Sequence, residues 1–343
     1  MTIDQRQLYA PADTARGDSL LRRAVREMAV QDWIVLGYLL TLNVAVLSAM
    51  RHTTLTDGLA KLIGLLVFQV ASLIIVRGGL IKHGIVAPLL YRLAIYGTVQ
   101  SSYFLFRDLL PVINPGALDR ELYHLDLNLF GFEPAMLMDS WVNSTTTEWF
   151  AFFYFGYFFL LALHVIPMLL FGKKEPLLSE FCFGMLFVFC VGHVIYTLVP
   201  GYGPYRAMAE HFSNPLPKGI WRDLVMSTVA SGGAQKDIFP SLHTGAPTFI
   251  LLWSFRHRRL TPFRYSWPVV AFATINIVIA TMFLRWHYVI DVLAGLLLAA
   301  AAVTVAAAVT RWELVRRAEH GLMANWPLFS VAPEPAPSKR RRS

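Results

Sequence analysis

Long apolar stretches, separated by short polar segments, recur along the whole chain. Most are close to the 17–25 residues that a helix needs to cross the hydrocarbon core of a bilayer. The shortest, 62–76, is flanked by Lys61 and Arg77, whose long side chains can reach the membrane interface. The pattern predicts an all-α, polytopic membrane helical bundle. The predicted spans are 33–50, 62–76, 85–106, 149–171, 179–199, 240–255, 267–284 and 288–310.

The segments outside these stretches predict how the rest of the chain is organised. Residues 1–32 are polar, and residues 311–343 form a basic, Pro-rich tail that we expect to be disordered from about 324 onward. Segment 107–147 contains RELYHLDLNLFGFEPAMLMDSW, which is amphipathic and aromatic. We expect this segment to lie along the membrane interface rather than across the bilayer.

Composition and charge support a membrane protein with a defined orientation. Only 15% of residues are charged and the mean hydropathy is +0.50, whereas soluble domains carry about 25% charged residues. With the N-terminus in the cytoplasm, most of the 30 Lys and Arg residues fall in cytoplasmic segments. We therefore expect a multi-pass protein of a bacterial inner or plasma membrane with both termini inside. Topology accounts for the net charge of +8, and we expect no nucleic-acid partner.

Three polar clusters fall on the outer, periplasmic or extracellular, side of this topology. PGYGPYRAM (200–208) follows the fifth span, DIFPSLHTGAP (237–247) opens the sixth, and RWHYVID (285–291) opens the eighth. A charged group inside a bilayer costs about 2.5–3.5 kcal/mol on insertion scales, so such residues usually serve a function. Three chain-distant clusters at one membrane face predict an active site there.

The third cluster contains an imidazole and a carboxylate four positions apart. At this spacing His287 and Asp291 share one face of a helix. The carboxylate can then orient one ring nitrogen and leave the other free, as in an activated nucleophile or general base. Each residue alone has an ordinary structural interpretation, as an interfacial aromatic or a helix-start residue, but their pairing favours catalysis.

The second cluster begins a helix that is suited to binding an anion. Pro240 and Ser241 are typical of a helix start, where free backbone amides can face a phosphate. His243, in the first turn, can protonate a leaving oxygen. Arg206 and Arg285 are candidates to hold the anion's oxygens, although both also fit structural roles at an interface. Candidate head-group contacts are Lys236, Tyr205 and Asp126.

This residue set suits phosphoryl transfer, which depends mainly on positioning and charge stabilisation. Other chemistries fit less well. His243, His287 and Asp291 can be imagined around one metal ion, but the chain has no HExxH motif and no histidine pair at i, i+4, so we predict no metal and no other cofactor. An esterase that uses Ser241 would lack the G-x-S-x-G turn of such enzymes.

These residues resemble the type 2 phosphatidic acid phosphatase superfamily, whose members are integral membrane enzymes. Its middle motif, Pro-Ser-Gly-His, is similar to 240–243, and its last motif ends in His-x3-Asp, as at His287 and Asp291. The leucine in place of glycine and the HYVIDVLAG context resemble the branch of inositol phosphorylceramide synthases and sphingomyelin-synthase-like phosphotransferases. The resemblance covers 85–310 and implies a six-helix catalytic core, preceded by two accessory helices in 33–76.

Two parts of the family pattern differ in this chain. The first motif has a lysine six residues before Arg-Pro, and only Arg206 corresponds to it here. The last motif usually carries Ser-Arg six residues before its histidine. Ala280 and Thr281 occupy those places, and Arg285 lies two residues before His287.

The resemblance implies a two-step, metal-independent mechanism. His287, oriented by Asp291, would attack the phosphorus of a lipid phosphoester, and His243 would act as acid and then as base. Ser241, Arg206 and Arg285 would hold the phosphoryl oxygens. We thus expect an inositolphosphotransferase-like transferase with a phosphohistidine intermediate, with a lipid phosphoester donor and a hydroxyl acceptor as partners. Alternatives are a hydrolase of lipid phosphate or polyprenyl diphosphate, with water as acceptor, and a non-catalytic protein that binds or transports membrane lipids.

Overall fold

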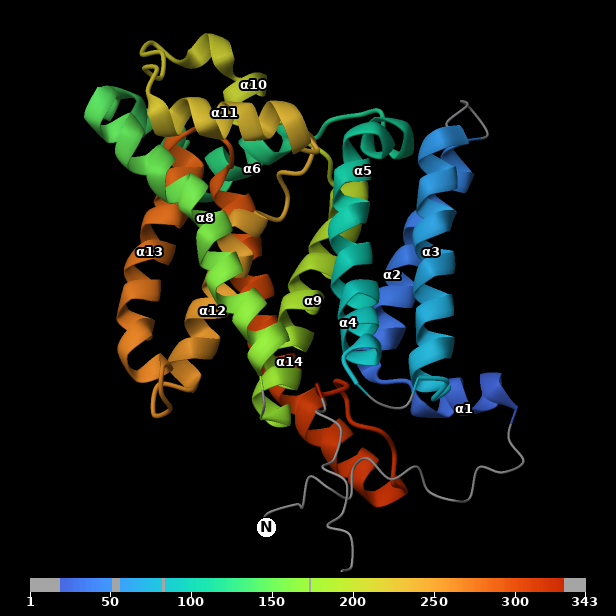
Figure 1. The fold of residues 1–343 in the computed structure, drawn as a ribbon. Coiled ribbons are helices and arrows are strands. Elements are labelled where there is room, and N and C mark those ends of the chain that lie inside the picture. Colours follow the sequence, from blue (N-terminus) through green and yellow to red (C-terminus); the bar gives the residue numbers. More distant parts are fainter. Residues whose placement is uncertain (1–18, 51–55, 82–83, 173, 330–343) are drawn as a thin grey trace, which may run out of the picture.

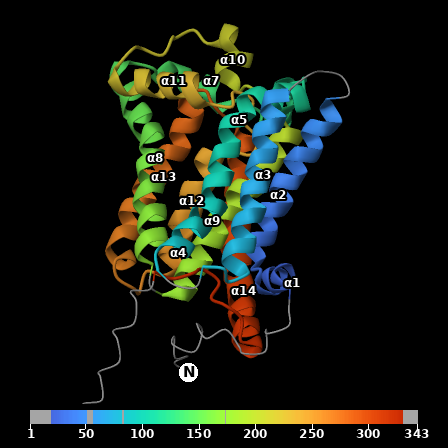
Figure 2. The same cartoon turned by 45° about the vertical axis from the view of Figure 1, so that its right-hand side comes forward.

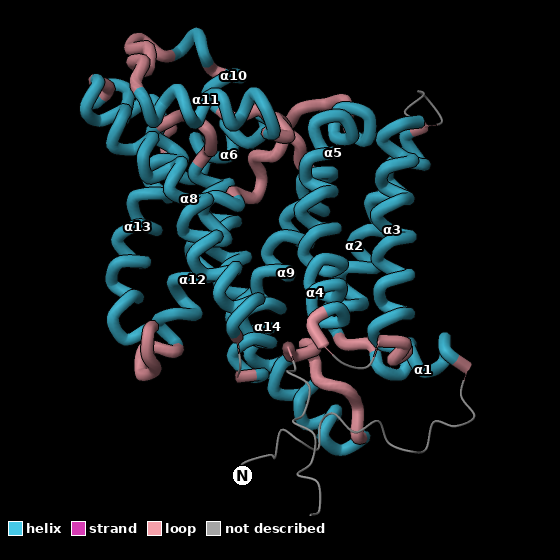
Figure 3. Tube along the Cα trace, in the orientation of Figure 1, coloured by secondary structure: helices cyan, strands magenta, loops and turns pink. Residues whose placement is uncertain are grey.

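Six helices of the described chain are long and apolar enough to cross a membrane. The computed structural model describes residues 19–50, 56–81, 84–172 and 174–329. In these residues the helices run roughly side by side as a bundle, and Figure 3 shows helices and loops with no strand. The predicted all-α polytopic membrane bundle is therefore confirmed. The six helices are α2 (Val30–Ala49), α3 (Thr56–Arg77), α8 (Ser144–Phe171), α9 (Glu175–Leu198), α13 (Phe263–Phe283) and α14 (Val289–His320).

The two other predicted spans are helical but differ from a simple spanning helix. The stretch 85–106 corresponds to α4 (Val86–Arg92), a π-helical turn (Leu93–Gly97) and α5 (Thr98–Ile113), which follow one another without a break. The stretch 240–255 corresponds to α12 (Leu242–Arg256), which has only 15 residues. Most of α12 is buried, because it packs on α8, α9, α13 and α14 rather than facing lipid.

Helix ends depart from the predicted boundaries where polar residues cap or extend them. Asn143 caps α8, so this helix begins five residues before the predicted span. The last helix, α14, continues ten residues past 310 and ends at Gly321 in the left-handed conformation. Residues 322–329 then fold back into the bundle, and Trp326 is fully buried. The expected disorder from 324 is therefore wrong for 324–329, while 330–343 lies outside the described residues.

Short helices lie across the bundle at its two ends (Figures 1 and 2). At one end are α6 (Asp119–Phe130), α10 (Pro204–Ala207) and α11 (Ile220–Gly232). The short helix α7 (Pro134–Met138) follows α6. The predicted interfacial segment therefore corresponds to α6 and α7, whereas 107–113 extends α5. At the other end lies α1 (Leu20–Glu27).

Glycines allow the two helices that carry the sixth and eighth predicted spans to pack closely. Gly245 on α12 faces Gly295 on α14, and a Cβ atom on Gly295 would lie 2.5 Å from the carbonyl oxygen of Ser241. Small residues at such crossings let helix backbones approach each other in membrane proteins. This contact fixes the start of α12 against the start of α14.

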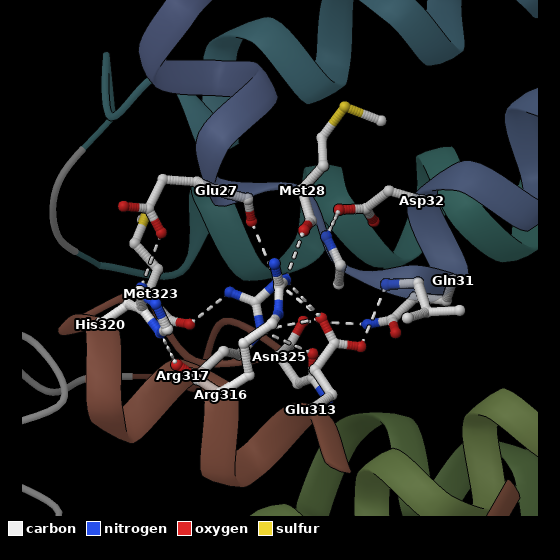
Figure 4. A network of polar contacts seen from close by, with 12 residues as sticks. Glu27, Met28, Gln31, Asp32, Glu313, Arg316, Arg317, His320, Met323 and Asn325 are labelled. Carbon is white, nitrogen blue, oxygen red and sulfur yellow. Dashed lines mark hydrogen bonds and ion pairs between the residues drawn. The ribbon is translucent and has the colours of Figure 1, made fainter. Parts of the chain in front are cut away.

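A buried polar network joins the accessory helices to α14 at the α1 end of the bundle. Arg77 has no exposed surface and forms an ion pair with Asp32 at 2.7 Å, and it donates to the carbonyls of Ala324 and Asn325. Figure 4 shows the continuation, in which Arg317 contacts Glu313 and Asn325. Two accessory helices, the last helix and the segment after it are thus joined by hydrogen bonds.

Candidate active site

The three polar clusters that the sequence places on one side lie together, joined by backbone hydrogen bonds. Gly201 N donates to Lys236 O at 3.2 Å, Tyr205 N to Arg285 O at 2.6 Å, and Ser241 N to Asp291 O at 3.0 Å. The first of these bonds accompanies an isolated bridge between Gly201 and Asp237. Main-chain contacts therefore fix the relative positions of the three clusters, at the end of the bundle where α6, α10 and α11 lie.

His287 lies two residues before the start of α14, and its ring faces the Asp291 carboxylate. The helix begins at Val289, so His287 lies in the connection before it rather than on its first turn. Its Nδ1 is 3.4 Å from Asp291 Oδ2, and the same oxygen accepts the Tyr288 amide at 2.9 Å. Both His287 Nδ1 and Asp291 Oδ1 are buried and have no hydrogen-bond partner in the described chain. The carboxylate thus caps the helix and faces the imidazole.

Burial keeps the His287 ring neutral near physiological pH. The residue is only 4% exposed, and this burial lowers the pKa of His287 to about 4, although the Asp237 carboxylate and the Ile238 backbone favour the protonated form. A neutral imidazole has a free electron pair on one nitrogen. Nδ1 points to Asp291, so Nε2 is the ring nitrogen that does not face the carboxylate.

His243 is held between two tyrosines of α8. Its ring stacks on Tyr154 with centroids 4.3 Å apart and lies 4.2 Å from the ring of Tyr157. The Tyr154 hydroxyl is 3.5 Å from Nδ1, while Nε2 is buried without a partner in the described residues. A charge on His287 acts on His243, so the two imidazoles share one electrostatic environment. One ring nitrogen of His243 is therefore available for proton transfer.

Ser241 is the N-cap of α12. It is fully buried, and its Oγ accepts a hydrogen bond from Thr244 N at 3.2 Å. This is the structural role that serine commonly has at a helix start. Its second predicted role, binding a phosphoryl oxygen, stays a prediction.

The two candidate arginines have different surroundings. Arg206 is exposed, and its guanidinium lies over the ring of Tyr202 at 4.2 Å. None of the ion pairs within residues 19–50, 56–81, 84–172 and 174–329 includes it. Arg206 is thus a cation at the site with no carboxylate partner there.

Arg285, in contrast, is bound to other protein groups. It forms an ion pair with Asp139 at 2.7 Å, donates to the Asn214 carbonyl and lies 3.9 Å from the Phe212 ring. Its backbone φ of +67° is uncommon for a residue with a side chain. The structure therefore gives Arg285 partners other than the predicted phosphate, and these partners fix the loop that carries His287.

Two of the three candidate head-group contacts also have internal partners. Lys236 is buried and its Nζ donates to the carbonyls of residues 114, 115 and 116 at 2.7–3.1 Å. Asp126 accepts the amides of Val289 and Ile290 at 2.7 and 3.0 Å, so it caps α14. Only Tyr205, whose ring is 4.8 Å from that of Trp286, remains half-buried beside the site.

Comparison with known families gives a match over more than half of the chain. Residues 120–305 match the PAP2 superfamily, the type 2 phosphatidic acid phosphatases. The chain belongs to the PAP2 superfamily. No curated protein and no solved structure matches it. The superfamily resemblance is confirmed, and membership supports a phosphatase or phosphotransferase activity. The match contains all three polar clusters and begins after α5.

Two carboxylates of this PAP2 protein, Asp119 and Asp139, hold the loops of the site in place. Asp119 accepts the amides of Tyr202 and Gly203 at 2.9 and 2.8 Å, and the Tyr288 hydroxyl at 3.3 Å. It therefore joins the first polar cluster to the third. Asp139 likewise holds Arg285. The sequence shows acidic residues in 119–139, but nothing in their spacing indicates partners 80 to 170 residues away. Within the described chain, no group of three His, Cys, Asp or Glu side chains is arranged to hold a metal ion.

Glu133 shares a buried environment with Asp126 beneath the start of α14. It is 2% exposed, and burial, together with the neighbouring Asp126 carboxyl, raises the pKa of Glu133 to about 8. The folded state therefore favours a protonated Glu133, whereas an unfolded chain ionises it near pH 4.5. Between these two values folding retains a proton, so stability must fall as pH rises.

We expect the Glu133→Gln variant to lose this pH dependence. As pH rises from 5 to 8.5, the thermal unfolding midpoint of wild-type protein in detergent should decrease, because the free energy of unfolding falls by roughly a few kcal/mol. The amide cannot ionise, so the variant's midpoint should fall less. Asp223→Asn, at an exposed carboxylate on α11, should keep the wild-type slope. Equal slopes for Glu133→Gln and wild type would contradict the assignment.

Proposed function

We propose that this protein is an integral membrane phosphotransferase that acts on a lipid phosphoester through a phosphohistidine at His287. One observation carries the proposal: a buried imidazole faces a carboxylate on one side and shares its surroundings with a second imidazole. Superfamily membership supports phosphoester chemistry in general. The inositol phosphorylceramide synthase-like branch, suggested by the Pro240–Ser241–Leu242–His243 motif, is part of the proposal.

In the first step, the His287 Nε2 electron pair attacks phosphorus and forms an N–P bond. The P–O bond to the lipid alcohol breaks and its electrons leave with the oxygen. His243, which enters this step as the imidazolium, gives that oxygen a proton and becomes neutral. The His287 ring becomes cationic, and the Asp291 carboxylate 3.4 Å from Nδ1 stabilises this charge. Nε2 of His243, which has no hydrogen-bond partner among the described residues, is the nitrogen suited to carry the transferred proton.

In the second step, a hydroxyl gives its proton to His243 and attacks the same phosphorus. The N–P bond breaks and its electrons return to His287, which restores the neutral ring. Water as acceptor makes the enzyme a phosphatase, and an alcohol makes it a transferase. Burial of His287 and Asp291 limits the access of bulk water, which favours an alcohol acceptor. Hydrolysis is the second candidate function, favoured by the superfamily match.

Arg206 is the residue that we assign to the phosphoryl oxygens. It is exposed beside the site, and no ion pair neutralises it in the described chain. A guanidinium can hold two oxygens of a phosphate at once. Arg285 becomes a positioning residue, because its contacts with Asp139 and Asn214 hold the loop before His287.

We also propose that the site faces the outside of the cell. Basic residues gather at the opposite end of the bundle: α1 carries Arg22, Arg23 and Arg26, and the last turns of α14 carry Arg316 and Arg317. Positive residues near spans favour the cytoplasmic side.

The decisive experiment follows a phosphorus label. Purified protein in micelles receives a phospholipid labelled at its phosphate, with no acceptor, with a polyol, or with a lipid alcohol. We expect acid-labile, base-stable label on the protein, followed by its appearance on an added alcohol. Intact cells supplied with the polyol from outside should form the same product. Wild-type protein that neither retains nor releases label with any acceptor would overturn the proposal.

A further inference from the structure

The short helix α1 lies across the end of the bundle opposite the candidate active site (Figures 1 and 2). Its last residue, Glu27, is three positions before Val30, where the spanning helix α2 begins. Its first residue, Leu20, meets the residue that follows α3, because a Cβ atom on Gly78 would lie 2.6 Å from Leu20 Cδ1. Both ends of α1 are therefore held where a spanning helix begins or ends, so α1 lies at the level of the membrane interface.

Contacts with the rest of the chain fix which side of α1 faces the protein. Arg23 Nη1 donates to the Gly78 carbonyl at 3.4 Å, and Ala24 is buried. Glu27 is buried as well, and its Oε2 accepts the amide of Met323 at 2.7 Å. These α1 residues are one to four positions apart and share one side of the helix. That side is occupied by protein, and α1 is held in one rotational position.

Two rows of exposed side chains cover the rest of α1. Leu21 and Val25, the apolar row, are four positions apart and are 59% and 48% exposed. Arg22 and Arg26, the basic row, are also exposed. Within the described chain Arg22 takes part in no ion pair, and Arg26 lies 3.7 Å from Glu27. With 3.6 residues per turn, the two rows are about 100° apart around the helix axis.

The surface of a membrane that contains anionic lipid matches these two rows. Its hydrocarbon accepts apolar side chains, and its phosphates attract basic ones. A guanidinium can also donate two hydrogen bonds to one phosphate. An isolated helix of this length is not stable in water, but the protein contacts of α1 hold it in place. Lipid can therefore bind to a surface that is already formed.

We propose that α1 is a binding surface for anionic phospholipid, with the basic row on the phosphates and the apolar row among the first acyl carbons. The lipids beside this end of the protein are then enriched in negative charge relative to the surrounding bilayer. The surface is separate from the candidate active site, which lies at the other end of the bundle. The proposal therefore does not depend on the proposed reaction.

The test measures which lipids lie beside α1 in the full-length protein. Val25→Cys is labelled in detergent with a small fluorescent group, and wild-type protein, whose Cys182 and Cys190 are buried, serves as the labelling control. The protein is then placed in nanodiscs of phosphatidylcholine and phosphatidylglycerol in equal parts. One of the two lipids carries a nitroxide near its head group. We expect the phosphatidylglycerol nitroxide to quench the label more strongly than the phosphatidylcholine nitroxide does.

The basic row is then replaced in the labelled protein. Arg22→Gln combined with Arg26→Gln should lower the preference for phosphatidylglycerol by up to about fivefold for each charge removed. Added salt should lower it too, because both arginines are exposed. The pair Arg22→Lys and Arg26→Lys keeps the charge and should retain most of the preference. Lys61→Gln removes an exposed cation near the other end of α3 and should leave the preference unchanged.

Three results would overturn the proposal. The first is equal quenching by the two lipids in nanodiscs that hold protein with the intact basic row. The second is a preference that persists when both arginines are glutamine, in protein that still elutes as a single species. The third is a label that neither lipid quenches, because another part of the chain or a second copy then covers α1.

Discussion

Replacing His287 with alanine is expected to lower turnover of a lipid phosphoester by roughly a thousandfold or more. The variant removes the imidazole that we propose as the nucleophile and that faces the Asp291 carboxylate. The measurement is the initial rate of label transfer in micelles at saturating donor. Protein-bound label should disappear together with activity.

The matched control is His164→Ala on α8. The His164 ring contacts the Leu160 carbonyl of its own helix, so its removal should change turnover little. Asp291→Ala is a poorer test of the nucleophile, because Asp291 also caps α14 and its loss would disturb the helix start. A His287→Ala protein that elutes as a single species and retains the wild-type rate would end the catalytic interpretation.

The second large effect is expected at the opposite end of the molecule. Arg77→Ala would leave the buried Asp32 carboxylate without its cation, and breaking one side of a buried ion pair costs about 3–5 kcal/mol. The variant should also lose the bonds to the carbonyls of Ala324 and Asn325. We expect the thermal midpoint in detergent to fall by several degrees, while the protein that remains folded keeps its activity.

Lys61→Ala provides the comparison for this prediction. Lys61 and Asp57 form an equally short ion pair, 2.6 Å, on the same helix, but both side chains are more than half exposed. Exposed pairs contribute little, because solvent screens them. If Arg77→Ala lowers the midpoint no more than Lys61→Ala does, the buried network has no special part in stability.

The sequence predicts the helices well because apolar length is a local property. It predicts their ends less well. The π-helical turn at 93–97 and the short α12 depend on neighbouring helices, and α14 continues past 310 because Glu313 and Arg317 have partners in the network. Composition indicates disorder around Trp326, yet its ring packs against Tyr91 and Tyr96, which lie more than 200 residues earlier.

The site, too, could be predicted only in part, because some of its contacts join residues that are far apart in the sequence. The convergence of three clusters follows from topology and could be predicted. His287 and Asp291 do face each other as predicted, but not on one face of a helix, because His287 lies before the start of α14. The partners of Arg285 and Asp126 could not, because Asp139 and the amide of Val289 are separated from them by 146 and 163 residues. A local pattern shows which groups are polar, whereas their pairing depends on the folded chain.

The bonds between Arg77 and the segment after α14 have a consequence for biosynthesis. A ribosome that has just delivered Arg77 to the membrane must add another 247 residues before Ala324, which accepts one of its hydrogen bonds, exists. Throughout that interval the first two spanning helices lack part of the structure that finally secures them. Assembly of this end is thus completed only after nearly the whole chain has been inserted. We expect the cell to treat chains truncated before residue 324 as incompletely assembled membrane proteins. A loss of activity in such chains would therefore report on assembly rather than on catalysis.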